Sequence, residues 1–175
     1  MAKLRKGVSY RFLERPYTRK SKYRKLSYVR SAPTSKVVKY NMGDVSKKFQ
    51  LTMNLITKDA LQIRHNAIES ARASSNKILE EALGKSGYFY QIRMYPHHIL
   101  RENPLASGAG ADRMSQGMAR PFGKPIGIAA QVKKGKILFT LKTDKQNLKL
   151  GKEALSRAKR KLPCRCLIEV IENKN

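Results

Sequence analysis

"TKDALQIRHNAIESARASSNKILEEALGKSG" (residues 57–87) predicts one long helix. Thr57 or Asp59 can cap its start, and glycines follow its last apolar positions. Small and apolar residues recur on one face between positions 61 and 82, which predicts a buried stripe. The stretch carries a third of the chain's 12 acidic residues: Asp59, Glu69, Glu80 and Glu81. We therefore interpret it as scaffold and not as a surface for polyanions.

Shorter patterns surround this helix. Strands are expected at residues 35–40 and 49–56 with a turn at 41–44, and then at 88–95, 126–132, 137–142 and 164–171. Residues 126–132 and 137–142 make a plausible hairpin around a Lys-Lys-Gly-Lys turn. A second helix is expected at residues 152–162. The order indicates an α+β class: a two-layer domain with two helices on one side of a mostly antiparallel sheet.

Composition restricts the function. The 175 residues contain 38 Lys and Arg against 12 Asp and Glu, a formal net charge of +26. Such an excess favours binding to a polyanion. A membrane is not an expected partner, because no apolar run approaches the roughly 18 residues that span a bilayer. Nucleic acid is the best remaining class.

The first 33 residues form a basic extension of a single domain at 34–175. Residues 1–30 hold eleven basic residues, one acid and five interleaved aromatic rings. A solvated, disordered tail is the alternative, but aromatic rings favour an arm that orders on RNA, where rings stack on bases and cations contact phosphates. The candidate contacts in this arm are Lys3, Arg5, Lys6, Arg11, Arg15, Arg19, Lys20, Lys22, Arg24 and Lys25.

An irregular stretch at residues 96–125, hereafter the finger, interrupts the domain and includes "SGAGADRMSQGMARPFGKP" (107–125). Loops longer than about 12–15 residues are usually disordered linkers or functional segments. A linker fits poorly between strands of one domain, whereas glycines permit close approach to another surface. Its expected phosphate contacts are Arg101, Arg113, Arg120 and Lys124.

The second predicted helix also has a basic side. Ala154, Leu155, Ala158 and Leu162 share a narrow apolar arc. The cations outside that arc are the last group of candidate RNA contacts: Lys152, Arg157, Lys159, Arg160 and Lys161.

Catalytic and cofactor motifs are weak. His97, His98, Cys164 and Cys166 lack the paired spacing of structural zinc sites, and the glycine-rich finger lacks the phosphate-loop pattern. We expect no cofactor, no metal and no catalytic residue. Two other hypotheses stay open: an RNA-acting enzyme using His97, His98 or Cys164, and a transient assembly factor. Two cysteines without a disulfide framework or leader favour the cytosol.

Residues 87–143, "GYFYQIRMYPHHILRENPLASGAGADRMSQGMARPFGKPIGIAAQVKKGKILFTLKT", resemble a universal family of large-subunit ribosomal proteins. Its bacterial branch is protein sixteen and its archaeal and eukaryotic branch is L-ten-e. The resemblance extends from "RPYTRKSKYRK" (15–25) to "ALSRAKRKLP" (154–163) and is most specific at residues 109–127. A missing Gly-Lys repeat near residues 118–124 and a short C-terminus indicate the archaeal type.

The resemblance implies an α/β-hammerhead fold and a structural, non-enzymatic role on the large subunit in the cytoplasm. It implies contacts with large-subunit rRNA, with 5S rRNA as a further candidate, and with neighbouring ribosomal proteins. It also implies that Arg101 and residues 109–120 reach toward the A-site tRNA and the peptidyl transferase centre.

Overall fold

Two antiparallel sheets form the framework of the chain in the computed structural model, which describes residues 5–17, 23, 25, 29, 32–106, 108–114 and 116–173. Two long helices, α1 (His65–Leu83) and α3 (Leu148–Lys161), accompany them. The fold is therefore of the α+β class, as the sequence predicts. No helix in the described ranges is long and apolar enough to cross a membrane.

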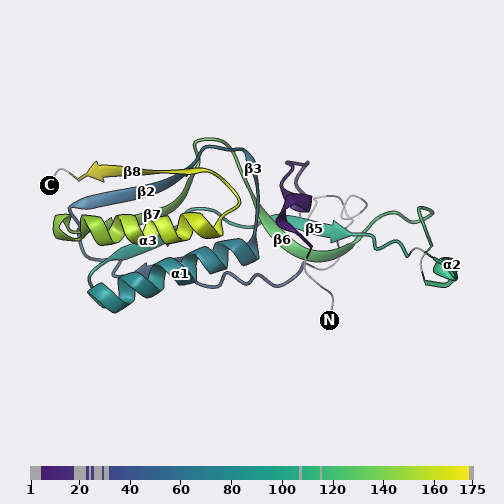
Figure 1. The fold of residues 1–175 in the computed structure, drawn as a ribbon, viewed down its shortest axis with the longest axis horizontal. Helices are drawn as coiled ribbons and strands as arrows, with labels where there is room; N and C mark the ends of the chain where they lie inside the picture. Colours follow the sequence, from purple (N-terminus) through teal and green to yellow (C-terminus); the bar gives the residue numbers. More distant parts are fainter. Residues whose placement is uncertain are drawn as a thin grey trace.

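The larger sheet has five strands in the order β1-β4-β7-β2-β8. These strands are β1 (Asn41–Gly43), β2 (Leu51–Thr57), β4 (Phe89–Ile92), β7 (Ile137–Thr143) and β8 (Cys166–Glu172). Helices α1 and α3 cover one face of it (Figure 1). Met53, Tyr90 and Phe139 are fully buried between these layers, and the Tyr90 and Phe139 rings stack at 5.4 Å. Their burial supplies the main hydrophobic stabilisation.

The smaller sheet has the order β3-β6-β5, with β3 (Leu61–Arg64), β5 (His98–Glu102) and β6 (Lys124–Val132). The predicted hairpin of residues 126–132 with 137–142 is wrong, because β6 and β7 belong to different sheets. The β2–β3 connection also passes from the larger sheet to the smaller one, beside the β6–β7 connection. There Thr57 donates its N–H to Lys136 O, and Gly135 donates to Thr57 O. These bonds satisfy backbone groups that a hairpin would otherwise have paired.

Other predicted boundaries also change. The expected helix at 57–87 begins only at His65, because residues 61–64 pair with β6 and bury Leu61 and Ile63. Tertiary pairing overrides local helix propensity here. Thr57 does not cap a helix; its hydroxyl bonds to the backbone of Asp59.

The strand expected at 35–40 is absent from the described structure there, and the expected turn contains β1 instead. The last residue of β1 has to be a glycine. Gly43 has φ +83°, and a Cβ there would lie 2.1 Å from the Tyr88 carbonyl oxygen. The start of the finger, predicted to be irregular, forms β5.

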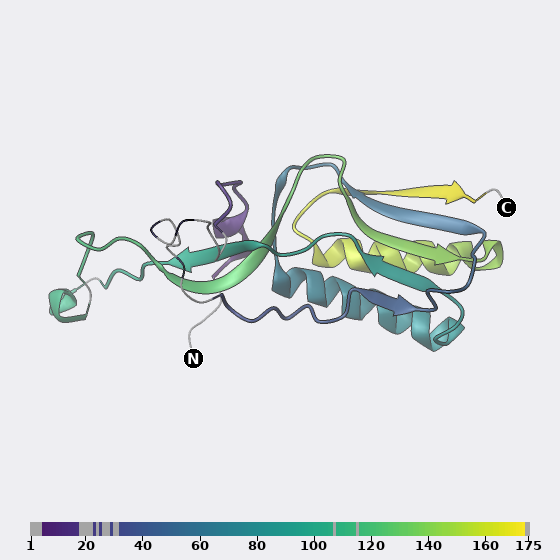
Figure 2. The ribbon, with the colours of Figure 1, turned by 180° about the vertical axis from the view of Figure 1, so that it is seen from behind.

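The molecule is elongated. The five-stranded sheet and its helices form a body at one end, the three-stranded sheet forms a neck, and the finger extends beyond the neck (Figures 1 and 2). A short helix, α2 (Ala111–Met114), lies at the far end of the finger. The described residues 5–17 therefore lie on the neck, and the finger carries its basic residues away from the body.

Candidate RNA interface

Residues 5–17, hereafter the strap, cross the three-stranded sheet. The strap contains a 3-10 helix at Gly7–Tyr10. Its carbonyls accept hydrogen bonds from all three strands, including Gln62 N–H to Arg11 O (3.2 Å), the Gln131 side-chain amide to Glu14 O (2.9 Å) and Ile99 N–H to Tyr17 O (2.8 Å). One backbone N–H on each edge strand, that of Gln62 in β3 and that of Ile99 in β5, thereby has an acceptor. This part of the predicted basic arm is integrated into the fold.

Val29, a later residue of the same extension, is also buried. It forms a small apolar cluster with Ile99 and Ile128 on the three-stranded sheet. The basic extension has too few apolar residues to form its own core, but Val29 completes the apolar cluster of the neck.

Arg101 joins the strap to the base of the finger. Its guanidinium carbon lies 4.0 Å from the centre of the Tyr17 ring and 4.1 Å from the centre of the Phe122 ring. Stacking between two rings is a favourable cation–π arrangement. Arg101 was predicted as a phosphate contact; in the structure it holds two aromatic rings together and is only partly exposed.

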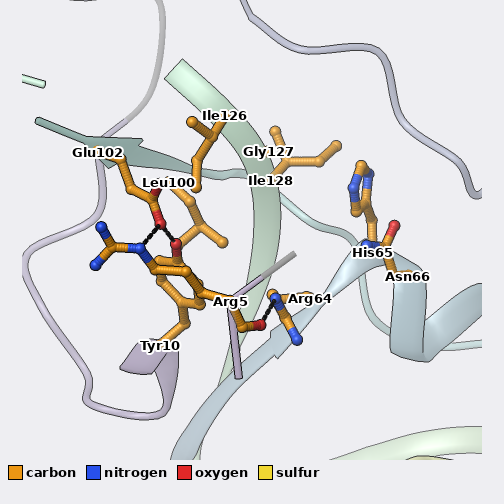
Figure 3. Close-up of a pocket in the computed structure, with 10 residues that line it drawn as sticks. All are labelled: Arg5, Tyr10, Arg64, His65, Asn66, Leu100, Glu102, Ile126, Gly127 and Ile128. Carbon is orange, nitrogen blue, oxygen red and sulfur yellow. Dashed lines mark hydrogen bonds and ion pairs between the residues drawn. The ribbon is translucent and has the colours of Figure 1, made fainter. Parts of the chain in front are cut away.

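Glu102, the next residue, neutralises part of this basic region (Figure 3). It accepts a hydrogen bond from the Tyr10 hydroxyl and forms an ion pair with Arg5, whose Nε lies 2.9 Å from Glu102 Oε1. Burial and the Glu102 contact raise the pKa of Tyr10 to about 12, so its hydroxyl stays protonated and keeps donating. Arg64 Nη1 donates to the Arg5 carbonyl at 3.0 Å, which ties this cluster to the start of α1.

His98 fixes the end of the strap. Its Nδ1 accepts the Tyr17 N–H at 2.8 Å, which requires a neutral ring protonated on Nε2. Burial lowers the pKa of His98, Arg101 acts in the same direction and Glu14 opposes it. The neutral form is therefore the one that the fold selects.

The finger beyond the neck is exposed and rich in turns. Its glycines at 108, 110 and 117 have φ between +58° and +116°. Arg113, Arg120 and Lys124 are exposed, as expected for phosphate contacts. At the base, a Cβ on Gly123 would lie 2.6 Å from the backbone of Glu102, so only glycine allows the two strands to approach this closely.

The cations of α3 lie on the body. Lys152, Lys159, Arg160 and Lys161 are exposed, whereas Arg157 pairs with Glu153 at 3.0 Å. The C-terminal turn of α3 points toward the neck in Figure 1, so its last three cations are the ones nearest the strap and finger. The apolar arc predicted for this helix is buried, including Ala154, Leu155 and Ala158.

The remaining predicted contacts divide into two groups. Lys6, Arg11, Arg15 and Lys25 are exposed. Lys3, Arg19, Lys20, Lys22 and Arg24 lie outside the described residues.

The residues considered for catalysis or metal binding do not converge. His97 is exposed with its ring 4.5 Å from that of Tyr95, whereas His98 is buried beside the strap. Cys164 and Cys166 are free thiols at the start of β8 with 3.4 Å between their sulfur atoms. In the part of the chain that the structure describes, no three His, Cys, Asp or Glu residues are grouped to hold a metal ion.

The structure adds residues that the sequence did not single out. Arg64 was hidden inside the expected helix, although it lies in the neck. A cavity of about 490 Å³ on the neck is lined by Arg93, Tyr95, His97 and Lys136, among others. Tyr95 is 52% exposed and stacks on Tyr40 at 5.4 Å. The only available signal was the cluster of aromatic residues at 88–95, with Arg93 among them.

Comparison with known proteins agrees with this arrangement. The family model for ribosomal protein L16p/L10e matches residues 15–169, from the end of the strap to β8. The chain is similar to proteins named large ribosomal subunit protein uL16. The relative from Methanococcus aeolicus is 46% identical over 168 residues, which cover 95% of this chain and 94% of that protein. One from Methanococcus maripaludis (strain S2) is 46% identical over 172 residues, or 98% and 96%. One from Archaeoglobus fulgidus is 45% identical over 154 residues, or 88% and 85%.

The chain belongs to the ribosomal protein L16p/L10e family.

It is of the archaeal type, as the sequence resemblance indicates. Membership makes it a structural ribosomal protein of the cytoplasmic translation machinery and not an enzyme. The RNA-acting enzyme that His97, His98 or Cys164 could have served is thus excluded by the family, in agreement with their separation in the structure.

Arg101→Ala is expected to release the strap from the finger. Losing two cation–π contacts should raise local opening by about tenfold, since each is worth roughly 0.5–2 kcal/mol. Hydrogen exchange of the Ile99 amide, which bonds to Tyr17, measures this opening. Arg93→Ala, at an exposed position outside the stack, is the matched control. Equal exchange in both variants would show that the stack contributes nothing.

Acid is expected to weaken the attachment of Tyr17. A His98 pKa below the ordinary 6.5 means that the unfolded state binds the proton more readily. This stabilisation is complete above about pH 6.5 and is lost as the pH falls through the folded-state pKa. An NMR titration of the His98 ring should give a midpoint under 6.5, with the protection factor of the Tyr17 amide decreasing in step. A midpoint at or above 6.5 would contradict the burial argument.

Proposed function

We propose that this chain binds large-subunit rRNA and helps to order the A-site tRNA and peptidyl transferase region during translation. The observation that carries the proposal is the segregation of charge along an elongated molecule. The strap on the neck and the finger beyond it present exposed cations, and Glu102, one of three acids in these two segments, is held by Arg5 and Tyr10. Exposed cations beside apolar and aromatic groups suit RNA.

Exposed apolar side chains accompany these cations. Phe12 is 77% exposed on the strap, and Met118 is 68% exposed on the finger. Such groups are unfavourable in water and would gain by contacting bases or sugars. The names of the archaeal relatives place those proteins in the large ribosomal subunit, which supports the same site for this chain.

Within this proposal, residues 1–33 act as an rRNA-binding extension of the single domain at 34–175. The finger contacts RNA and tRNA near the reaction centre, as the sequence resemblance implies. 5S rRNA and adjacent ribosomal proteins are the further proposed partners. The contact residues are the cations of the strap, finger and α3 described above.

The salt dependence of RNA binding tests the part played by α3. Log affinity for nucleic acid falls with log salt by about 0.7–0.9 per neutralised phosphate. The double variant Lys159→Gln, Lys161→Gln should bind deproteinised large-subunit rRNA more weakly and reduce the slope by about 2. The control is Lys77→Gln, Lys85→Gln, which removes the same charge from α1 and the turn that follows it. Equal reductions in both variants would indicate that only net charge matters.

Shortening the finger tests its role in translation. Replacing residues 107–120 with a short glycine linker leaves the β5–β6 pairing and Gly123 in place, so the melting temperature should change little. Peptide synthesis by large subunits assembled with this variant should be impaired. The control is a similar replacement of residues 45–48, at the opposite end of the molecule (Figure 1). Normal synthesis with the shortened finger would contradict the proposed role.

A further inference from the structure

A cavity of about 250 Å³ lies in the neck, between the strap, the sheet and the first turn of α1 (Figure 3). It is smaller than the ~300–1,000 Å³ typical of pockets for drug-sized ligands. Its size therefore suits a single small ring system. Its lining comprises an apolar and aromatic part, the ion pair of Arg5 with Glu102, and a polar end at His65 and Asn66.

The apolar half has a wall and an aromatic ring. Leu100, Ile126 and Ile128 form the wall, and Ile126 is 47% exposed in spite of its apolar side chain. The Tyr10 ring also lines the cavity, and the guanidinium carbon of Arg64 lies 5.4 Å from its centre. A flat wall, a ring and a guanidinium are the surfaces on which proteins stack unpaired bases.

The polar end offers one acceptor and one donor. Asn66 Oδ1 is buried and has no hydrogen-bond partner among the described residues. His65 Nδ1 accepts the Lys36 N–H at 3.3 Å, so the proton of the neutral ring is on Nε2, which can donate. Burial, Lys36 and Arg64 all lower the pKa of His65 and favour that neutral ring. Both side chains line the cavity and are adjacent in sequence.

We propose that this cavity binds one extrahelical adenine or cytosine of an RNA chain. In both bases an amino group, which can donate to Asn66 Oδ1, lies beside a ring nitrogen, which can accept from His65 Nε2–H. Tyr10 and Ile126 cover the faces of the base, and Arg5 and Arg64 at the rim contact its phosphate. The inference rests on the proposed RNA-binding function and adds a base-specific site to it.

Gly127 provides a way to fill the cavity without removing a charge. It lines the cavity, and a Cβ there would meet only His65 Nε2, at 3.8 Å. Gly127→Leu should therefore place its side chain in the space proposed for the base. Val45→Leu adds the same side chain at a 68%-exposed position on the body and is the matched control.

The test is dimethyl sulfate probing of large-subunit rRNA in subunits assembled with each protein, since this reagent reads adenine N1 and cytosine N3. We expect one adenine or cytosine to be protected by the wild type and by Val45→Leu. It should lose that protection with Gly127→Leu, while the protein remains bound. Asn66→Ala removes the carboxamide, with its acceptor Oδ1, and leaves the cavity open. It should expose the same nucleotide with no loss of melting temperature, which guards against misfolding of the leucine variant.

Two outcomes would overturn the inference in different ways. If all variants bind and give identical reactivities, the cavity holds no base although the RNA-binding function stands. If the wild-type protein itself fails to bind rRNA, the proposed function fails and the base site fails with it.

Discussion

The hydrogen bonds between the strap and the three-stranded sheet are the constraint on which the functional end of the molecule depends. Three strap carbonyls, at Arg11, Glu14 and Tyr17, each accept from a different strand. A three-stranded sheet has two edges, and the strap accepts a hydrogen bond from one backbone N–H on each of them. Val29 adds apolar burial beside Ile99 and Ile128, so the neck can support a long finger.

The same contacts determine how charge is displayed. Arg101 and Glu102 adjoin each other at the base of the finger, yet neither acts as an isolated charge. Arg101 stacks between Tyr17 and Phe122, and Glu102 is held by Arg5 and Tyr10. Pairing an acid within a basic surface reduces its repulsion of phosphates. The cations that remain exposed are thus free to define a surface suited to RNA.

Much of the fold was predictable where a pattern is local. The buried arc of α3, the end of α1 at Gly84 and strands β2, β4 and β8 follow from periodicity and glycine signals. Residues 61–64 were misassigned because they fit a helix locally, whereas their backbone partners lie about 70 positions away in β6. For the same reason Arg64 was missed as a member of the neck.

By itself the sequence determined the family and the large excess of positive charge. A net charge of +26 favours a polyanionic partner, and the finger motif is specific enough to identify relatives. Only the tertiary structure decided which cations are fully exposed and which also contact other parts of the protein. Arg101 and Arg5 carry the same charge as their neighbours, but their contacts are two aromatic rings and a carboxylate distant in sequence. Composition and spacing contain no record of those distances.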